Sequence, residues 1–213
     1  MRTLFNIVTG FALLVALIGI GTRWLLKDDD GSRACQRVNE APAAAVAACT
    51  VLLDRGAEIR AARRAVAFGN RCVAYENLGN RDAALADCDE AIRLDPRLAG
   101  PYNTRGVVHI NRGNLDAAFV DLNEAVRLDP RSPRPYNNRG NLHGLRGNAD
   151  AAIADYSEAI RLDPTYALAF HNRARVHASR RDIEATRADL AEANRLGRTE
   201  AGAELALIEQ RLR

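Results

Sequence analysis

The chain has 213 residues, enough for one or two domains, and its 30 basic and 27 acidic residues leave a formal net charge of +3. This balance argues against nucleic acid or an acidic membrane surface as a general partner, because either would select a strong basic excess. Hydrophobic residues make up 47% of the chain, whereas aromatic residues make up only 5%. Ala and Leu dominate the apolar content, which favours helices that approach one another closely.

The N-terminal segment is apolar. It is uncharged from Leu4 to Gly21, and its apolar character continues to Leu26. With that extension it is long enough to span a bilayer, so residues 1–27 are expected to form an uncleaved membrane anchor. A signal peptide cleaved at the small residues 19–21 is the alternative. Both interpretations predict export of the rest of the chain, although the flanking charges do not decide the orientation.

Four cysteines follow the apolar segment, and an even number there fits an oxidising compartment. We expect a disulfide between Cys35 and Cys49, because a loop folding back would bring Cys35 to a helix over residues 41–54. Closing about fifteen residues would contribute on the order of 3 kcal/mol in the chain-entropy model. Cys72 and Cys88 fall at one level of a predicted hairpin, so a second bridge stays open. Cysteines in helix cores are more often packed as small hydrophobic residues, however.

A period of 34 residues governs the remainder of the chain. The sequence Arg-Leu-Asp-Pro ends at positions 96, 130 and 164, and the same step separates aromatic, arginine, aspartate and alanine residues. These residues are Phe68, Tyr102, Tyr136 and Phe170; Arg71, Arg105, Arg139 and Arg173; Asp87, Asp121, Asp155 and Asp189; and Ala91, Ala125, Ala159 and Ala193. A fixed period of this length indicates stacked copies of one supersecondary unit rather than an irregular globule.

Each repeat is predicted to hold two helices, A and B, joined by a tight turn. In the second repeat, helix A runs from about Pro101 to Arg112, and Gly113 then tolerates a left-handed conformation. Asn114 suits the N-cap of helix B. Helix B continues to the Leu-Asp-Pro sequence, where proline ends it and resets the chain for the next repeat.

Residues equidistant from the turn should lie side by side in such a hairpin. Arg71 is then level with Asp87, which predicts an ion pair in every repeat; a phosphate-binding arginine column would leave the aspartates unexplained. Cys72 has small equivalents in the other repeats, which we interpret as a close approach of two backbones. The equivalents are Gly106, Gly140 and Ala174.

Three histidines, His109, His143 and His177, also follow the period, at the position of Tyr75 in the first repeat. Equivalent residues of stacked helices lie at least about 8–10 Å apart, too far for a shared zinc ion with bonds of about 2 Å. They are therefore interpreted as core residues, and no metal or other cofactor is expected. The sequence has no G-x-S-x-G, H-E-x-x-H or P-loop motif, so we expect no enzyme activity.

The repeated pattern N-x-R-G…G-[ND]…A-x-x-D-x-x-[ED]-A-[IV]-R-L-D-P resembles the tetratricopeptide repeat, in the form common in exported bacterial proteins. In the fourth copy Arg181 replaces the turn glycine and Arg198 the closing proline. The four copies are residues 65–98, 99–132, 133–166 and 167–198, together 65–198. The resemblance implies an all-α, right-handed superhelical solenoid of helix hairpins, preceded by the transmembrane or signal helix.

Segments on both sides of the repeats are expected to cap them. Residues 28–64 should form a linker and a degenerate capping helix. Residues 199–213 should form a C-terminal capping helix, because an apolar stripe runs along them at helical spacing. The stripe is Ala201, Leu205, Ile208 and Leu212.

The resemblance also implies that helix A of each repeat lines a concave groove. The candidate partner-binding residues there are Asn70, Asn77, Asn103, Asn111, Asn137, Asn138, Asn141, Asn172 and Arg175. The same stripe includes Gly69, Val73, Thr104, Val107, Leu145, His171 and Ser179. A carboxamide offers an acceptor and two donors, so an asparagine-lined groove suits the main chain of an extended peptide. The alternative is that these asparagines only keep an exposed face soluble.

We therefore expect a non-enzymatic protein–protein interaction scaffold that is membrane-tethered or exported. It would bind an extended segment of a protein or peptide partner, and neither nucleic acid nor a small-molecule substrate. The expected location is the cell membrane with the repeats on the periplasmic side, or, after signal cleavage, a secreted or soluble periplasmic state. The alternative function is a structural assembly factor that acts by self-association or through its convex face.

One subtype of the family clamps the acidic C-terminus of cytosolic chaperones with basic groove residues. Gly69, Val73 and Asn138 stand at positions where that subtype needs lysine or arginine. The export signal also argues against a cytosolic chaperone, so the sequence predicts a different kind of partner.

Overall fold

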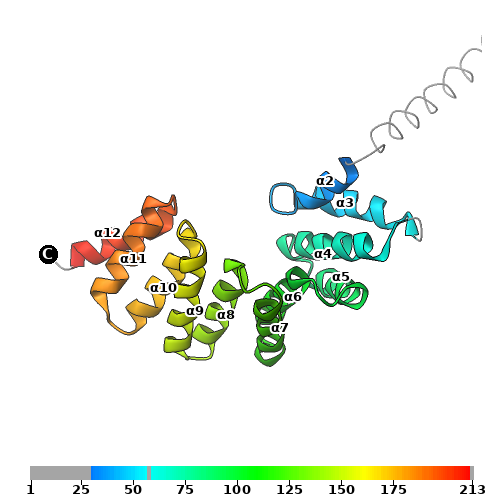
Figure 1. Cartoon of the computed structure of the whole chain (residues 1–213). Coiled ribbons are helices and arrows are strands. Elements are labelled where there is room, and N and C mark those ends of the chain that lie inside the picture. Colours follow the sequence, from blue (N-terminus) through cyan, green and yellow to red (C-terminus); the bar gives the residue numbers. More distant parts are fainter. Residues whose placement is uncertain (1–29, 57–58, 212–213) are drawn as a thin grey trace, which may run out of the picture. The chain divides into compact units, whose positions relative to one another are not determined.

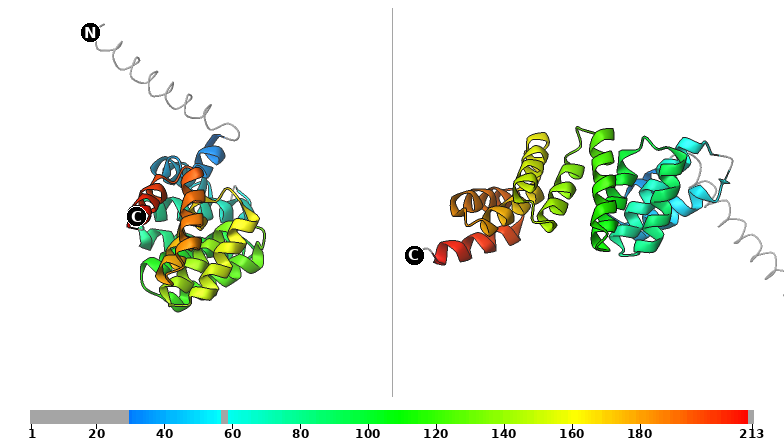
Figure 2. Two further views of the ribbon diagram at one scale, coloured as in Figure 1. Left: turned by 90° about the vertical axis from the view of Figure 1, so that its left-hand side faces the viewer. Right: turned by 90° about the horizontal axis from the view of Figure 1, so that it is seen from below.

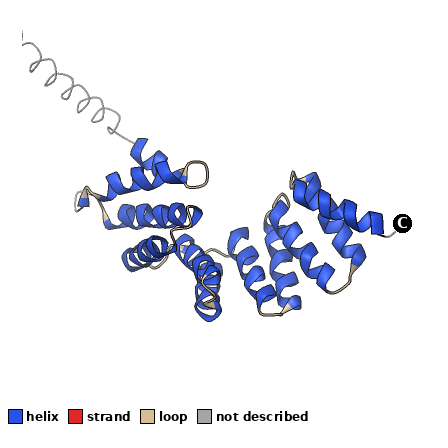
Figure 3. Ribbon diagram, turned by 180° about the vertical axis from the view of Figure 1, so that it is seen from behind, coloured by secondary structure: helices blue, strands red, loops and turns tan. Residues whose placement is uncertain are grey.

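The computed structural model describes residues 30–56 and 59–211, and all regular structure in them is α-helical (Figures 1 and 3). This confirms the predicted all-α class. The apolar segment expected to be an anchor or signal, residues 1–27, lies outside the described residues. Within the described part of the chain, no helix is both long enough and apolar enough to cross a membrane.

The chain divides into two compact units, Met1–Leu94 (unit 1) and Asp95–Arg213 (unit 2), which we describe separately. The helices of unit 1 are α2 (Asp30–Gln36), α3 (Pro42–Leu53), α4 (Ala61–Asn77) and α5 (Arg81–Leu94). Those of unit 2 are α6 (Ala99–Asn111), α7 (Leu115–Leu128), α8 (Pro133–Leu145), α9 (Ala149–Leu162), α10 (Ala167–Ser179), α11 (Ile183–Arg195) and α12 (Thr199–Arg211).

Unit 1 contains a helix that the sequence did not predict. Helix α3 corresponds to the helix expected over residues 41–54, and it begins with Pro42 in its first turn, where a missing N–H costs nothing. Cys35, expected in a loop, lies instead on the seven-residue helix α2, which packs on α3. A helix this short is marginal alone, so its contacts with α3 and α4 hold it in place.

Unit 2 is a series of antiparallel hairpins, α6–α7, α8–α9 and α10–α11, followed by α12 (Figure 2). The second helix of each hairpin packs on the next, and the first helices α6, α8 and α10 contact one another in turn. Helix α12 follows the last hairpin, and Ala201, Leu205 and Ile208 pack with Ala174 and Leu190. The fourth member of the predicted stripe, Leu212, lies outside the described residues.

The turns between paired helices have the predicted left-handed residue. Its φ is 75° at Gly79, 77° at Gly113 and 75° at Gly147. Arg181, which replaces the glycine in the last repeat, takes φ 61° and is the positive-φ non-glycine residue of the described chain. The hairpin geometry therefore overrides the preference of the arginine backbone there.

The helix caps follow the prediction only in part. Asn80 and Asp182 each accept a backbone N–H, from Ala83 at 3.3 Å and from Ala185 at 3.2 Å. Asn114 occupies the N-cap position of α7 as expected, but its side chain makes no capping hydrogen bond. The position of Asn114 in the sequence thus predicted where α7 begins. It did not predict how the first N–H groups of α7 are bonded.

At Gly106 and Gly140 the small residue of helix A makes room for a large side chain of helix B. A Cβ atom added to Gly106 would lie 2.8 Å from Cγ of Leu122, and one added to Gly140 would lie 2.8 Å from Cε1 of Tyr156. The predicted close approach of two backbones is seen in the first copy, where the Cα atoms of Cys72 and Cys88 are 5.3 Å apart. At Gly106 and Gly140 the atoms nearest to an added Cβ belong to a side chain. The glycine accepts the residue that faces it from helix B, so each hairpin packs densely.

The predicted ion pair is confirmed in all four repeats. The N–O distances are 2.6 Å for Arg71–Asp87 and 2.7 Å for Arg105–Asp121, Arg139–Asp155 and Arg173–Asp189. Two parallel hydrogen bonds join the partners of each pair, the strongest arrangement for these groups. The hydrogen bond to Asp155 is also the main reason that the pKa of Arg139 is raised.

The same arginines join neighbouring hairpins. Arg71 donates to Thr50 of α3 at 2.9 Å, and Arg173 donates to Ser157 of α9 at 2.8 Å. Arg139 makes the equivalent bond to Asn123 of α7, at 2.9 Å. These three guanidinium groups thus tie their own hairpin to the preceding one within the same unit.

The histidines that follow the period are partly buried and lie near carboxylates. Nε2 of His109 is 3.8 Å from Asp121, and Nε2 of His143 is 3.8 Å from Asp155. Burial is the main reason that the pKa of His143 is lowered, and its ring packs edge-on against Phe119. Among the described residues, no group of three His, Cys, Asp or Glu side chains could hold a metal ion.

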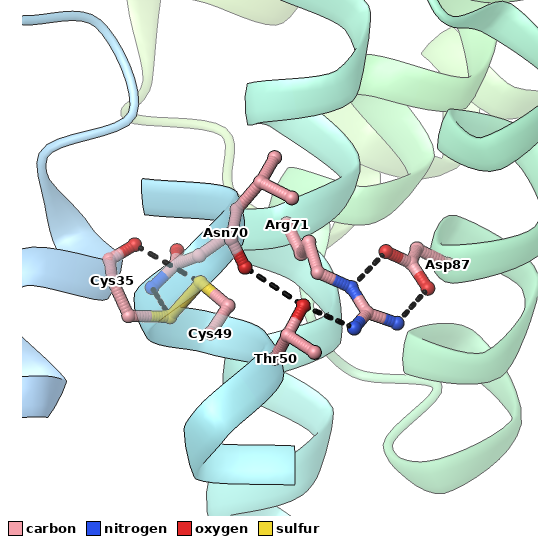
Figure 4. The surroundings of a disulfide bond; sticks show 7 residues. Cys35, Cys49, Thr50, Asn70, Arg71 and Asp87 are labelled. Carbon is pink, nitrogen blue, oxygen red and sulfur yellow. Dashed lines mark hydrogen bonds and ion pairs between the residues drawn. A yellow bond between two sulfur atoms is a disulfide. The ribbon is translucent and has the colours of Figure 1, made fainter. Parts of the chain in front are cut away.

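Two disulfides hold the hairpins of unit 1. Cys35 of α2 is joined to Cys49 of α3, with 4.8 Å between their Cα atoms (Figure 4). Cys72 of α4 is joined to Cys88 of α5, with 5.3 Å between the Cα atoms. The sequence favours packed thiols for the second pair, but two facing positions of a hairpin fall within the usual Cα separation of a disulfide. All four sulfurs belong to buried residues.

Candidate functional site

The asparagines of the predicted groove bond to one another in unit 2. Nδ2 of Asn138 donates to Oδ1 of Asn103 at 2.9 Å, and Nδ2 of Asn172 donates to Oδ1 of Asn137 at 3.0 Å. Asn137 in turn donates to Asn138 at 3.3 Å. We call these four residues the asparagine ladder. It joins α6, α8 and α10, so its amides stack one repeat on the next.

Three polar side chains of the predicted stripe are buried and do not face a groove. Asn137 is 1% exposed, and Thr104 and His171 are each 7% exposed. His171 lies between Arg198, whose Nε is 2.8 Å from Nδ1, and Glu204, whose Oε1 is 3.1 Å from Nε2. The prediction that Asn137 binds a partner is therefore wrong, because its side chain is enclosed between hairpins.

In unit 1 the predicted groove asparagines contact the α2–α3 hairpin. Nδ2 of Asn70 lies 3.9 Å from Sγ of Cys35 (Figure 4), and Nδ2 of Asn77 donates to the carbonyl of Val38 at 2.9 Å. These amides therefore help to hold the short helix α2 on α4. Asn111, the last predicted asparagine outside α8 and α10, is exposed at the end of α6.

An open pocket of about 550 Å³ lies between α8, α9 and α10 in unit 2. It brings together three of the predicted binding residues, Asn141, Asn172 and Arg175, with Leu145 and Ser179 of the same stripe. Its full lining is Asn141, Gly144, Leu145, Tyr156, Leu168, Asn172, Arg175, Val176 and Ser179. We call it the α8–α10 pocket, and its size is in the range of known ligand sites.

Each of the two amide side chains in the pocket uses only one of its hydrogen-bonding groups within the fold. Oη of Tyr156 donates to Oδ1 of Asn141 at 2.7 Å, and Nδ2 of Asn172 is committed to the asparagine ladder. This leaves the amide N–H groups of Asn141 and the carbonyl oxygen of Asn172. Burial raises the pKa of Tyr156, so its hydroxyl stays protonated and keeps Asn141 in this orientation. The two amides therefore offer the pocket one donor group and one acceptor group.

Apart from the amides, Tyr156 and Ser179, the lining is apolar with one cation. Leu145 is 61% exposed, and Leu168 and Val176 are partly buried. Among the described residues that line the pocket, Arg175 alone carries a charge. It is exposed and has no ion-pair partner within the described part of the chain, whereas neighbouring Arg173 is paired with Asp189. Arg175 is therefore available to an anionic group.

Four lining residues were not predicted from the sequence: Gly144, Tyr156, Leu168 and Val176. Tyr156 was overlooked because its equivalents in the other repeats are core residues, namely Cys88, Leu122 and Leu190. The signal in the sequence was the hydroxyl of Tyr156, because this position of the repeat is apolar in the other copies. It has a bonding partner on the groove side, Asn141, and the other repeats have none there.

Family models give the first comparison with known proteins. A model described as tetratricopeptide repeat matches residues 65–98 and 133–166, and one described as TPR repeat matches residues 108–147. No curated protein sequence matches the chain.

Solved structures give the second comparison. The thermophilic TPR protein TTC0263 from Thermus thermophilus has a TM-score of 0.67 and 20% identity, over 79% of this chain and 91% of that chain. MamA from Desulfovibrio magneticus RS-1 has a TM-score of 0.61 and 17% identity, over 79% of this chain and 92% of that chain. The first TPR of Spaghetti (RPAP3), bound to an HSP90 peptide, has a TM-score of 0.51 and 23% identity, over 54% of this chain and 92% of that chain. At these identities the likeness shows the fold alone.

Proposed function

We propose that this chain, parts of which match tetratricopeptide-repeat models and which folds into helix hairpins, is a non-enzymatic scaffold that binds an extended segment of a partner protein. The binding site is the α8–α10 pocket. Within the predicted stripe, binding thus falls to Asn141, Asn172 and Arg175, whereas Asn103, Asn137 and Asn138 bond within the asparagine ladder.

One observation carries the proposal: the pocket combines exposed apolar surface with hydrogen-bonding groups that are not used within the fold. Leu145 is 61% exposed although it is a large apolar residue. Asn141 and Asn172 keep a donor and an acceptor beside it. A concave, mostly apolar site with a few oriented polar groups is typical of ligand binding. The fold-level likeness to a TPR structure that holds a peptide agrees with this function.

We further propose that the repeats act outside the cytoplasm, tethered to the cell membrane by residues 1–27 or released after signal cleavage. The apolar segment and the two disulfides of unit 1 support this location. Protease added to intact spheroplasts should digest the repeats. Protected repeats with four free thiols would contradict the location.

Photo-crosslinking with the intact chain tests the site. A benzoylphenylalanine at position 145, in the pocket, should capture a protein from the native membrane fraction. The matched control is position 120, since Val120 is 68% exposed and does not line the pocket. Equal capture at both positions would refute the proposal that the pocket is the binding site. Crosslinks only between copies of this chain would favour assembly by self-association instead.

A further inference from the structure

We infer that the α8–α10 pocket selects an internal partner segment in which an apolar and an acidic side chain lie within about two residues of each other. This inference rests on the proposed function and specifies the chemistry of the partner. It follows from three properties of the lining: its two unused amide groups, its apolar wall and its one cation.

The amide groups fix how the partner main chain lies. Asn141 presents N–H donors because its oxygen accepts from Tyr156, and Asn172 presents an oxygen because its N–H bonds to Asn137. One donor and one acceptor match the C=O and the N–H of an extended main chain. Since both amides are already oriented by bonds within the fold, they do not have to be ordered when the partner binds.

The apolar wall selects one side chain of the partner. Leu145 projects from the end of α8, and Leu168 and Val176 belong to α10, so the wall has contributions from both helices. An apolar side chain between them would remove the exposed surface of Leu145 from water. A charged side chain at that point would lose hydration, and Leu145, Leu168 and Val176 have no polar group to replace it.

The cation selects the neighbouring side chain. Arg175 follows Asn172 by three residues, which is about 4.5 Å along a helix. An extended chain advances about 3.3 Å per residue, so an acidic group one or two residues beyond the amide-bound residue reaches Arg175. A carboxylate matches the planar guanidinium better than any neutral group does. No acidic residue lines the pocket to compete for it.

Selection from a random peptide library tests this inference. The full chain is used to select twelve-residue peptides displayed on phage with their C-termini fused, so that no free carboxylate is present. The enriched peptides should contain an apolar residue with Asp or Glu within two positions. Arg175→Gln should weaken their binding at least fivefold, and Arg175→Glu should enrich Lys or Arg at the acidic position. Arg131→Glu, which changes an exposed arginine of the same unit outside the pocket, should change neither result.

Each other outcome has a distinct meaning. Enriched peptides without an acidic preference that are lost on Leu145→Glu would overturn the inference and leave the pocket as the site. Peptides insensitive to Leu145→Glu would overturn both the inference and the proposed function. A synthetic copy of a selected peptide is tested with a free and with an amidated C-terminus. Binding only with the free carboxylate would overturn the inference that the pocket binds an internal segment. A selection that enriches no peptide also counts against the inference.

Discussion

The two units solve the same packing problem in different ways. In unit 1 a disulfide joins Cys72 of α4 to Cys88 of α5. One period later, in unit 2, the equivalent positions are Gly106 and Leu122, where the glycine receives the leucine side chain. One pair of facing positions therefore holds a covalent bond in one unit and a glycine contact in the other. The period of the sequence therefore predicts which positions of two helices face each other. It does not predict whether a disulfide or a packing contact joins them.

The difference agrees with the size of the two units. The described part of unit 1 has two hairpins, and the first includes a helix of only seven residues. Small cores bury a smaller fraction of their surface and are often stabilised by disulfides. Unit 2 has three hairpins and the helix α12, which covers the apolar end of the last hairpin. Its larger core does without a covalent bond.

The largest expected effect is that of removing the disulfides. Replacing both pairs by serine should lower the stability of unit 1 by about 3 kcal/mol per bridge, because the loops closed are about 15 and 17 residues long. Hydrogen exchange followed by mass spectrometry should show faster exchange in α2–α5 and unchanged exchange in α8–α11. Equal loss of protection in both units would contradict the comparison. As a matched control, Cys72→Gly with Cys88→Leu copies the contact of unit 2 and should cost less than the serine pair.

Removing the shared arginine should affect the two units alike. Arg71→Met or Arg173→Met leaves Asp87 or Asp189 buried without its partner. We expect each to cost about 2–3 kcal/mol, less than a fully enclosed pair, because both arginines are partly exposed. Urea unfolding followed by circular dichroism would measure the loss. Lysine at the same position keeps the charge and should recover part of it; full recovery would show that the paired hydrogen bonds do not matter.

A side chain at Gly140 should destabilise unit 2 by overpacking. Gly140→Val places new atoms against the ring of Tyr156 and should cost about 1–3 kcal/mol. The control is Gly144→Val on the same helix, where an added Cβ meets no atom within 4 Å. A comparison of the two thermal midpoints separates packing from helix propensity. If both substitutions cost the same, the contact with Tyr156 is not what requires glycine.

The smallest expected effect concerns the asparagine ladder. Asn138→Ala removes a hydrogen bond between repeats and should lower the stability of unit 2 by about 0.5–1.5 kcal/mol. Asn148→Ala is the control, since Asn148 is exposed and its side chain makes no capping bond. Thermal unfolding of both variants measures the difference. An unchanged thermal midpoint for Asn138→Ala would show that the hydrogen bond between Asn138 and Asn103 does not stabilise the fold.

Much of the fold follows from the period. Aligning the copies predicted the helix pairs, the left-handed turn residues and the Arg–Asp pair, because each depends on residues of one hairpin. Helix α2 was not predictable in this way, since it is short, lies outside the repeats and depends on tertiary contacts.

The site was predicted less well, for a physical reason. Contacts within a hairpin can be inferred from distance to the turn, but contacts between hairpins depend on how one helix is rotated against the next. Asn138 and Asn103 are 35 residues apart, and only the packing of α8 on α6 brings them together. The sequence therefore predicted correctly that these asparagines form hydrogen bonds. It did not predict that their bonding partners are asparagines of other repeats. Asn141, Asn172 and Arg175 remain as candidate binding residues because they also line the pocket.

The most direct test of the account is the affinity of the captured partner segment for two variants of the full chain. Leu145→Glu places a charge on the apolar wall of the α8–α10 pocket, and Val120→Glu places one on a similarly exposed site outside it. Fluorescence anisotropy should show binding at least tenfold weaker for Leu145→Glu, which is about 1.4 kcal/mol, and unchanged for Val120→Glu. Parental affinity in Leu145→Glu together with weakened binding in Val120→Glu would contradict the account and move the interaction surface away from the pocket.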